Sequence, residues 1–456
     1  MTAFSIAQGV AKAVGRGLTA PGSGGGGPLP IPAGFDWTPP VSVFRSSDGV
    51  YSTDYDPTPF LVEGDPGVTT FYVDGDTGSD ANPGTAVSPK KSLVPISGGR
   101  VNKLLIKARG TFYGGYTSPV QVGHDELCVE AWDGAYCAIT TLPSPTAPFV
   151  WTDEGGGVWS APPMFSGFNG INPYAGTDIE TLQKYPLAAS LAACQATPGT
   201  HFRETVPSIK HYVHTLDGTS PATGHTIFGN VIAAQSFSTA AFAFNQRLAF
   251  HGITFMGGPT AFNVLGTTAL QKRVDFVNCA FKHAGSFGAL QATGNALVIS
   301  YESSAGPSVF DGFSYTTASG AAGTEVPSAV EINCTGYNNG FVNTGANQGS
   351  TTHFGGKLLR VNGTYQGNGD DQIADVGTDT HSWNLGCTFG PRGEPSGDAG
   401  ARAGNGVGNT TLWLDGCTFD TVSFDVAADP AGSTVYYKNM AAPGLKTGST
   451  GTVTTY

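Results

Sequence analysis

The chain has 456 residues, 39% of them hydrophobic and 12% charged, and its 66 glycines and 30 prolines favour an all-β protein with many turns over a disordered one. The net charge of −12 and the isoelectric point near 5.1 argue against nucleic acid binding, which needs a basic face, and no apolar stretch is long enough to span a bilayer. Seven cysteines without a CxxC or other metal-ligand spacing predict small buried thiols, with no metal and no cofactor.

The N-terminal residues 1–34 have the pattern of an attachment device. Residues 1–18 repeat small apolar side chains at helical spacing, which predicts an amphipathic anchor helix that needs a partner to bury its stripe. A signal peptide is the alternative, but no charge precedes the apolar part. Residues 19–34 are rich in Gly and Pro and predict a linker that stiffens toward its end. The aromatic, proline-broken residues 35–68 predict a small adaptor segment.

Residues 69–245 are expected to form the first turns of β structure, with loops and one inserted helix at about 186–195. Strands are expected in 71–73, 104–113, 127–134 and 209–218. The spacing of Asp74, Asp76, Gly78 and Asp80 faintly resembles a calcium loop, but the acidic residue expected at its twelfth position is absent. A polar turn, in which the Asp side chains bond the backbone, is therefore favoured.

From 246 to 440 the chain repeats one pattern. An alternating apolar run ends in Asn or Gly, then a small residue, then Thr and an aromatic, as in LWLDGCTFD (412–420) and VDFVNCAFK (274–282). The mean period is about 27 residues if one unmarked repeat lies near 297–303. The small residues of the repeats form one column: Ile253, Cys279, Cys334, Gly363, Cys387 and Cys417.

A period of this length with alternation of two inside each unit predicts a solenoid built of strands. Equivalent side chains of stacked strands lie above one another, so the cysteines are expected to fill a narrow lumen as a ladder, without disulfides. The preceding Asn or Gly is expected to turn the corner, because these residues tolerate left-handed backbone angles. The alternation suggests that Trp383 points inward and that Trp413 points outward. Residues 441–456 are expected to be a C-terminal tail.

These repeats, with their N/G-C-T-F corners and the front end YVDGDTGSDANPGT (72–85), resemble right-handed parallel β-helix proteins of the pectate-lyase-like superfamily. The tethered N-terminal segment adds a likeness to bacteriophage tailspikes and tail fibres of that fold. The resemblance covers roughly residues 69–440. It implies a homotrimer of β-helices on a virion that binds, and in one version depolymerises, a host surface polysaccharide.

Candidate site residues follow from two patterns. Asp311, Glu331, His353 and Asp375 are separated by 20, 22 and 22 residues, which would place them on one face if the turns were that long. The stretch GNGDDQIAD (367–375) holds Asp370, Asp371 and Asp375, and a carboxyl pair is what glycoside hydrolysis requires. In the alternative interpretation, the residues of both sets lie in turns or make only ordinary hydrogen bonds and have no functional role.

Gly369-Asp370-Asp371 also resembles the paired aspartates of β-helix polygalacturonases. However, the Gly-His-Gly and Arg-Ile-Lys stretches of that family do not follow. Trp413 and Tyr337 are expected to stack on sugar rings or, equally, to form a subunit seam. The glycine-rich loop 390–409 is expected to overhang a glycan groove or to touch a neighbouring subunit.

The leading hypothesis is an extracellular virion spike or tail fibre that binds host polysaccharide and attaches to a tail, neck or head protein through residues 1–35. Enzymatic activity stays open. The rivals are a secreted bacterial polysaccharide lyase or hydrolase, a purely structural virion fibre or adaptor, and a bacterial surface adhesin. The last is weakened because residues 445–456 contain no sorting signal or long apolar tail.

Overall fold

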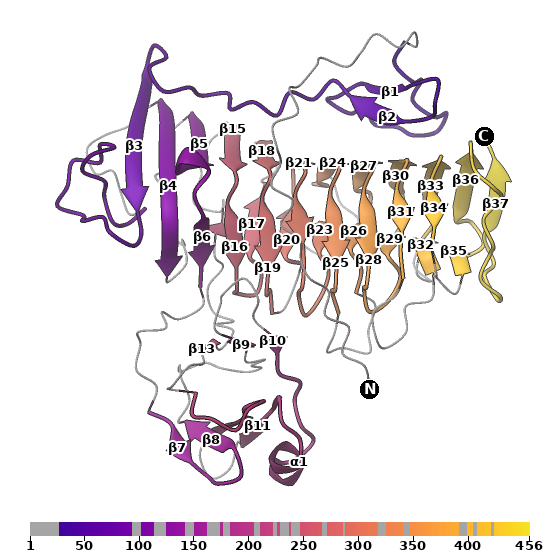
Figure 1. Ribbon diagram of the computed structural model, residues 1–456. Coiled ribbons are helices and arrows are strands. Elements are labelled where there is room, and N and C mark those ends of the chain that lie inside the picture. The colour runs from indigo at the N-terminus through magenta and orange to yellow at the C-terminus, as the bar shows by residue number, and fades with distance from the viewer. Residues whose placement is uncertain are drawn as a thin grey trace.

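The chain winds into a parallel β-solenoid (Figure 1). The computed structural model describes residues 27–93, 102–113, 125–141, 150–161, 174–176, 183–204, 210–221, 226–228, 237–238, 247–266, 271–285, 288–317, 325–340, 347–391, 399–404, 408–420 and 424–456. Within these ranges three parallel sheets form the body, and each turn between residues 247 and 428 contributes one short strand to each sheet in succession.

Sheet 1 is the longest. Its strands, in spatial order, are β3 (Val68–Asp74), β4 (Lys103–Tyr113), β5 (Glu126–Ala131), β15 (Arg247–His251), β18 (Lys272–Val277), β21 (Ala296–Tyr301), β24 (Ser328–Ile332), β27 (Lys357–Val361), β30 (Thr380–Leu385), β33 (Thr410–Asp415), β36 (Thr434–Lys438) and β37 (Thr452–Thr455). A single 3-10 turn, η1 (Trp132–Gly134), follows β5.

Sheets 2 and 3 are built of shorter strands. Sheet 2 consists of the end of β4 and then β6 (Cys137–Thr140), β16 (Thr254–Met256), β19 (Ala280–Lys282), β22 (Ser304–Ala305), β25 (Thr335–Tyr337), β28 (Thr364–Gln366), β31 (Thr388–Phe389) and β34 (Thr418–Phe419). Sheet 3 consists of β14 (Phe237–Ser238), β17 (Phe262–Leu265), β20 (Leu290–Thr293), β23 (Phe313–Thr316), β26 (Ser350–His353), β29 (Ile373–Val376), β32 (Ala399–Ala403) and β35 (Phe424–Ala428).

The predicted cysteine ladder is confirmed. All seven cysteines are free and buried, and each repeat thiol sits directly after a sheet 1 strand. Each donates to a carbonyl oxygen of the preceding turn: Cys279 to Phe250 at 3.3 Å, Cys334 to Ser300 at 3.2 Å, Cys387 to Arg360 at 3.7 Å and Cys417 to Asn384 at 3.4 Å. Burial raises the pKa of Cys279 to about 12, so this thiol stays protonated and inert.

The unmarked repeat is also present. Strand β21 pairs in parallel with β18 on one side and β24 on the other. Ser303 takes the place of the cysteine in this turn, and its hydroxyl accepts from the backbone N–H of Cys279 at 3.1 Å. This turn lacks the sequence marker because serine replaces the thiol and Ala305 replaces the aromatic residue.

The corner residues adopt the left-handed conformation that the sequence predicts. Asn278, Asn333 and Asn362 have φ between 52° and 54°, and Gly386 and Gly416 have φ of 60° and 63°. The aromatic residues after the corner stack along the lumen in the pairs Phe255–Phe281, Tyr365–Phe389 and Phe389–Phe419. In the turns that have both features, the corner residue and the aromatic stack together fix the register.

The inward orientation expected for Trp383 is wrong. Trp383 pairs with Trp413 across β30 and β33, and both side chains lie on the outer face of sheet 1, each 2% exposed. Leu412 and Leu414 do point into the lumen. The alternation misleads because both faces of these strands are covered, so an apolar side chain is stable on either side.

The cover on the outer face is a strap formed by residues 28–61. It contains the hairpin β1 (Val43–Arg45) and β2 (Tyr51–Thr53), and it runs from the late turns back to β3 (Figure 1). Phe35 packs edge-on against Trp413 with ring centroids 5.6 Å apart. At the far end of the strap, Leu61 packs against Leu105, Cys128 and Ala249 of the early turns.

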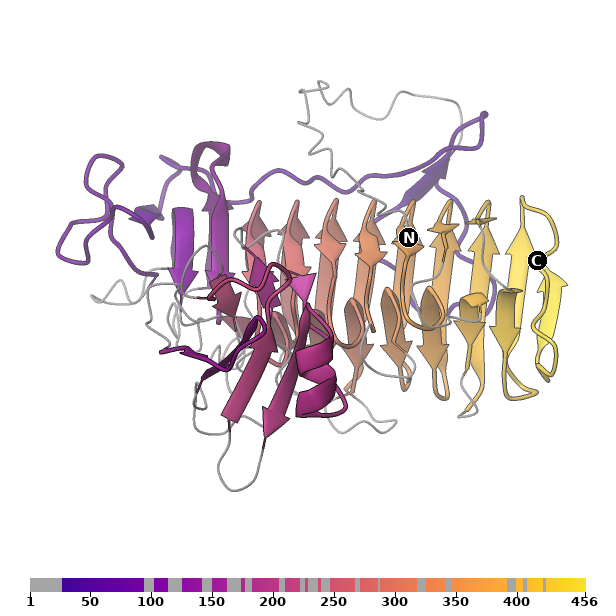
Figure 2. The ribbon, with the colours of Figure 1, turned by 60° about the horizontal axis from the view of Figure 1, so that its bottom comes forward.

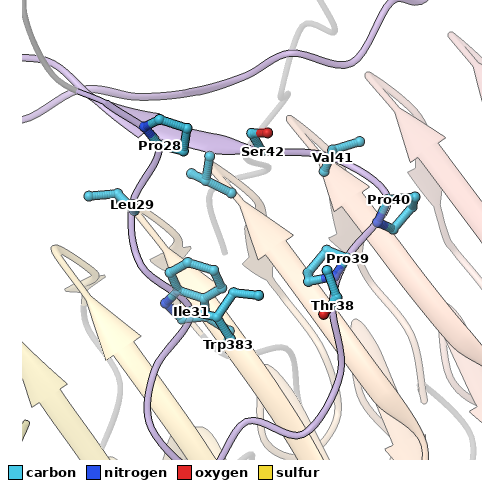
Figure 3. A pocket seen from close by; sticks show the side chains of 10 residues that line it. Pro28, Leu29, Ile31, Thr38, Pro39, Pro40, Val41, Ser42 and Trp383 are labelled. Carbon is cyan, nitrogen blue, oxygen red and sulfur yellow. The ribbon is translucent and has the colours of Figure 1, made fainter.

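Polar contacts hold the strap in register. The Tyr51 hydroxyl donates to Asp415 at 2.6 Å, and Asp36 lies 2.7 Å from Lys357 and 2.8 Å from His381. The strap also closes a cavity of about 320 Å³ over Trp383 (Figure 3). The cavity is lined by Pro28, Leu29, Ile31, Thr38, Pro39, Pro40, Val41, Ser42, Val43 and Trp383.

An insertion interrupts the solenoid between β6 and β14 and lies to one side of the early turns (Figure 2). An antiparallel sheet, with strands β7 (Thr152–Asp153), β8 (Val158–Ala161), β11 (Thr200–Glu204) and β12 (Lys210–His214), packs against α1 (Leu191–Ala196). A second small sheet contains β9 (Tyr174–Gly176), β10 (Gln183–Lys184) and β13 (Thr226–Phe228).

The inserted helix begins later than the sequence predicts. Ser190 caps α1 by accepting from the N–H of Ala193 at 3.1 Å, so the helix starts at Leu191 rather than at Pro186. The expected anchor helix at 1–18 lies outside the described residues. Of the helical segments that the structure describes, none has the length and apolar character needed to cross a bilayer.

We predict that Phe35→Ala loosens the strap from the late turns. Removing a buried aromatic ring should lower the free energy of unfolding by about 3–5 kcal/mol and expose Trp383 and Trp413. Denaturant unfolding and a red shift of tryptophan emission measure both effects. Val50→Ala, at a strap residue that is 58% exposed, is the matched control and should change neither. Unchanged emission in Phe35→Ala would contradict the packing role of the strap.

Candidate active site

In three successive turns, a ladder of polar side chains supports the corner between sheet 2 and sheet 3. Ser308 donates to Asn339 Oδ1 at 2.9 Å, and Asn339 Nδ2 donates to Asn368 Oδ1 at 2.9 Å. Asn368 Nδ2 in turn donates to Gln372 Oε1 at 2.9 Å. All four residues are buried, so the ladder fixes the backbone of three successive corners without needing water.

The register of sheet 3 aligns three polar residues just after this ladder. Phe313 pairs with Ser350 and Ser350 with Ile373. Asp311, Gln348 and Asp371 each lie two residues before these positions. Backbone hydrogen bonds extend this alignment to the three polar residues. For example, the Gly312 N–H donates to the Gln348 carbonyl oxygen at 2.8 Å. At about 4.8 Å per turn, the backbones of Asp311 and Asp371 are roughly 10 Å apart.

Gln348 links two carboxyl groups across these turns. Its backbone N–H donates to Asp311 Oδ1 at 2.9 Å, and its side-chain Nε2 donates to Asp370 Oδ2 at 3.3 Å. Asp311 and Asp370 are both half-buried, so solvent reaches them. Burial raises the pKa of Asp311 to about 7, the Gln348 amide opposes the rise, and the charge of Asp370 adds to it.

Asp371 has a different environment from its neighbour. It is fully buried, accepts from the N–H of Ala399 at 2.8 Å and is hydrogen-bonded to Arg402. Burial raises the pKa of Asp371, while the Arg402 guanidinium acts in the opposite direction. Both carboxylate oxygens are occupied, so Asp371 holds the corner and the next turn together, and Asp311 and Asp370 form the accessible pair.

Glu331 and Asp375 lie elsewhere, inside the lumen. Both are completely buried and flank Arg360, whose Nη2 is 3.3 Å from Asp375 Oδ1. Glu331 accepts from Ser350 at 2.7 Å and from Tyr365 at 2.5 Å, and Ser350 also accepts from Arg360 at 3.0 Å. Burial raises the pKa of both carboxyls. The structure therefore separates Asp375 from Asp370 and Asp371, with which the sequence grouped it.

The remaining predicted residues are also separated. His353 lies half-buried on sheet 3 beside Thr351, and burial lowers its pKa to about 4, so it is neutral. Tyr337 ends β25 and is half-buried, at the start of the corner that leads to Gln348. Trp413 is covered by the strap and is closed to a glycan in this conformation. Of the loop 390–409, residues 392–398 and 405–407 lie outside the described ranges.

The turn at Asp74 has the hydrogen bonding of the polar turn that the sequence favours. Asp74 accepts from the N–H groups of Asp76 and Thr77 at 3.0 and 2.9 Å and pairs with Arg109 at 2.8 Å. Its oxygens are thus used within the turn, as a backbone-bonding Asp requires. Within the described ranges, no group of three or more His, Cys, Asp or Glu side chains is arranged to hold a metal ion.

Two residues of the corner were missed from the sequence, Gln348 and Arg402. Gln348 lies two residues before the inward-facing Ser350, as Asp311 does before Phe313. An alignment of the repeats on their sheet 3 strands would have shown this column. Arg402 had no such signal, because its partner is two residues before a strand of the neighbouring turn and only the folded register brings them together.

Comparisons with known proteins identify the fold. No family model and no curated protein matches the sequence. A solved structure described as a glycoside hydrolase superposes with a TM-score of 0.53 at 10% identity, over 85% of this chain and 96% of that chain. XylC in complex with xylose follows, with a TM-score of 0.44, 10% identity and coverage of 84% and 68%.

A rhamnogalacturonan lyase gives a TM-score of 0.29 at 14% identity, with coverage of 82% and 69%. At 10% identity the likeness to the glycoside hydrolase shows a shared fold and nothing further. The two structures with TM-scores below 0.5 carry no weight for function. The expected parallel β-helix fold is thus supported, while nothing in these comparisons indicates a phage origin.

We predict unequal losses of stability when the two partners of the lumen ion pair are replaced. Arg360→Met leaves Glu331 and Asp375 buried without a counter-charge and should lower the free energy of unfolding by about 3–5 kcal/mol at pH 7. Asp375→Asn keeps a hydrogen-bonding group beside Arg360 and should cost about 1 kcal/mol or less. Thermal and denaturant unfolding measure the difference, and equal losses would contradict the charge balance.

The same pair predicts a pH dependence. Because burial raises the pKa of Asp375, the folded state binds a proton that the unfolded state releases near pH 4. The stabilisation by that proton is complete below pH 4 and is lost as the pH rises through the folded pKa. Asp375→Asn should therefore become more stable relative to the native protein as the pH rises above about 4. If the free energies of unfolding of the two proteins change with pH in parallel, Asp375 does not titrate in this way.

Proposed function

We propose that this protein binds a polysaccharide along the corner between sheets 2 and 3 and hydrolyses its glycosidic bonds. The observation that carries the proposal is the accessible carboxyl pair Asp311 and Asp370, held by one glutamine across successive turns. The shared fold with a glycoside hydrolase supports a carbohydrate ligand. Lyase activity is less favoured, because the described corner contains one cation, Arg402, and Asp371 already engages it.

The two carboxyls have distinct environments, as glycoside hydrolysis requires. Asp311, with its raised pKa, retains a proton near neutral pH and can donate it to the leaving glycosidic oxygen. Asp370, fixed by Gln348 Nε2, is placed to attack the anomeric carbon or to take a proton from the attacking water. One proton passes to the leaving group and water supplies the hydroxyl of the other product, so the reaction balances without a cofactor.

Asp371 and Arg402 are positioning residues in this scheme. Their ion pair spans from the turn of Asp370 to the turn of β32 and is nearly closed to solvent. It fixes the backbone on the C-terminal side of Asp370, while the ladder of Asn339 and Asn368 fixes the other side. A rigid setting of this kind keeps two carboxyls at a working separation, which in glycosidases is about 5–10 Å.

We predict that Asp311→Asn and Asp370→Asn each reduce hydrolysis at least about a hundredfold while leaving glycan affinity within a few-fold, because each removes a proton-transfer or attacking group. Release of reducing ends and calorimetric binding separate the two effects. Asp420→Asn is the matched control, since Asp420 is exposed on sheet 2 two turns beyond Asp370's turn. Full activity in either active-site variant overturns the assignment.

The pH profile is a separate prediction. Asp311 acts in its protonated form, so kcat/KM should fall as the pH rises through about 7. In Asp311→Asn, residual activity should lose this alkaline limb. A limb that persists in the variant would assign the titration to another group.

We further propose that the hydrolysed glycan is a host surface polysaccharide and that the protein is a homotrimeric spike or tail fibre of a virion. The resemblance of the tethered N-terminal segment to that of tailspikes supports this, as does the path of the strap, which brings residue 28 to the late turns. Residues 1–26 would bind a tail, neck or head protein. Mass spectrometry of purified particles and the mass of the native oligomer test the proposal, and absence from the particle would favour a secreted hydrolase.

A further inference from the structure

The charge of the candidate site restricts the sugar that it accepts. Between residues 283 and 437 the sequence contains four cationic residues, Lys357, Arg360, Arg392 and Arg402. Lys357 pairs with the strap through Asp36, and Arg360 lies in the lumen. Arg402 is engaged by Asp371. Arg392 belongs to a loop whose sequence also contains Glu394 and Asp398.

The Asp371–Arg402 pair is neutral as a whole, so Asp370 and the ionised fraction of Asp311 leave the corner negative. A further cation, Lys282, ends β19 one turn before the turn of Asp311, in the sheet 2 column that also contains Tyr337 and Gln366. It lies three turns from the turn of Asp370, which is about 14 Å at 4.8 Å per turn. Recognition of a sugar carboxylate or sulfate uses Arg or Lys at hydrogen-bonding distance.

The groups around the pair suit hydroxyls instead. The Gln348 amide and the Asp370 carboxylate present a donor and acceptors at the site. Gln366 is exposed at the end of β28, and Tyr337 precedes it in the same column of sheet 2. Uncharged amide, phenol and carboxylate groups match the donor and acceptor pattern of neutral sugar rings, whose faces also pack on an aromatic side chain.

We infer that the sugar rings flanking the cleaved bond are uncharged, and that polyuronates and sulfated glycans are poor substrates. This inference rests on the proposed hydrolase function. An anionic substituent on either ring would lie beside Asp370 with no described cation to balance it. β-Elimination is disfavoured for the same reason, since it needs a uronate carboxylate neutralised by a cation.

The test compares derivatives of one polymer that differ in charge. A panel of neutral polysaccharides, polygalacturonate and alginate identifies a polymer that the protein cleaves. Hydroxyethyl and carboxymethyl derivatives of that polymer, at equal substitution, are then compared by release of reducing ends. We expect kcat/KM for the carboxymethyl form to be at least about tenfold lower, equivalent to about 1.4 kcal/mol, and the gap to narrow at high salt.

Gln366 provides matched charge variants outside the carboxyl pair. Gln366→Lys should raise the relative rate on the carboxymethyl derivative several-fold, and Gln366→Glu should lower it. Equal rates on both derivatives, or cleavage of polyuronate alone, would overturn the inference and leave the hydrolase function standing. If no polymer is cleaved but a neutral one binds, the hydrolase function fails. If none is bound or cleaved, both fail.

Discussion

The structure depends on one constraint, the in-register stacking of parallel strands at about 4.8 Å per turn. Once the corners are fixed, each position of a turn lies directly over the same position of the next. The thiols of the repeats then form a ladder, each bonded to a carbonyl of the turn before. Asn339 and Asn368 form a second ladder at another corner. The side chains that fill the lumen and those that support the corners therefore contact the neighbouring turns, so no turn is stable alone.

The same constraint puts charges in the lumen. One inward column runs through Phe276, Ser300, Glu331, Arg360 and Asn384 before it returns to Leu414. A polar segment thus separates two apolar cores. Where the lumen is polar, the outer face is apolar and the strap covers it. The strap couples late turns to early ones, which nearest-neighbour stacking alone cannot do, and so offsets the weaker apolar packing inside.

The sequence predicted the features that recur in each repeat, but it did not predict the lumen charges or the strap that covers the outer face. The cysteine column and the asparagine corners could be read because each recurs at a fixed place in the unit. Alternation shows that a strand has two faces but not which one is inside, and here both are buried. Trp383 was therefore placed on the wrong side, and the roles of Glu331 and Asp375 in the lumen went unrecognised. A segment covering an outer face has no periodic signal, so the strap could not be foreseen.

The carboxyl pair shows how a solenoid corner brings residues from distant parts of the chain together. Asp311 and Gln348 are 37 residues apart in the chain, yet a single hydrogen bond joins them because the sheet on one side and the asparagine ladder on the other set their positions. Loop length between them can change without moving either group, since the length is absorbed outside the ladder. Burial in the corner raises the pKa of Asp311, while part of its side chain remains exposed to solvent. The rigid backbone, the raised pKa of Asp311 and the tolerance of different loop lengths thus arise from one feature, the corner where the chain passes from sheet 2 to sheet 3.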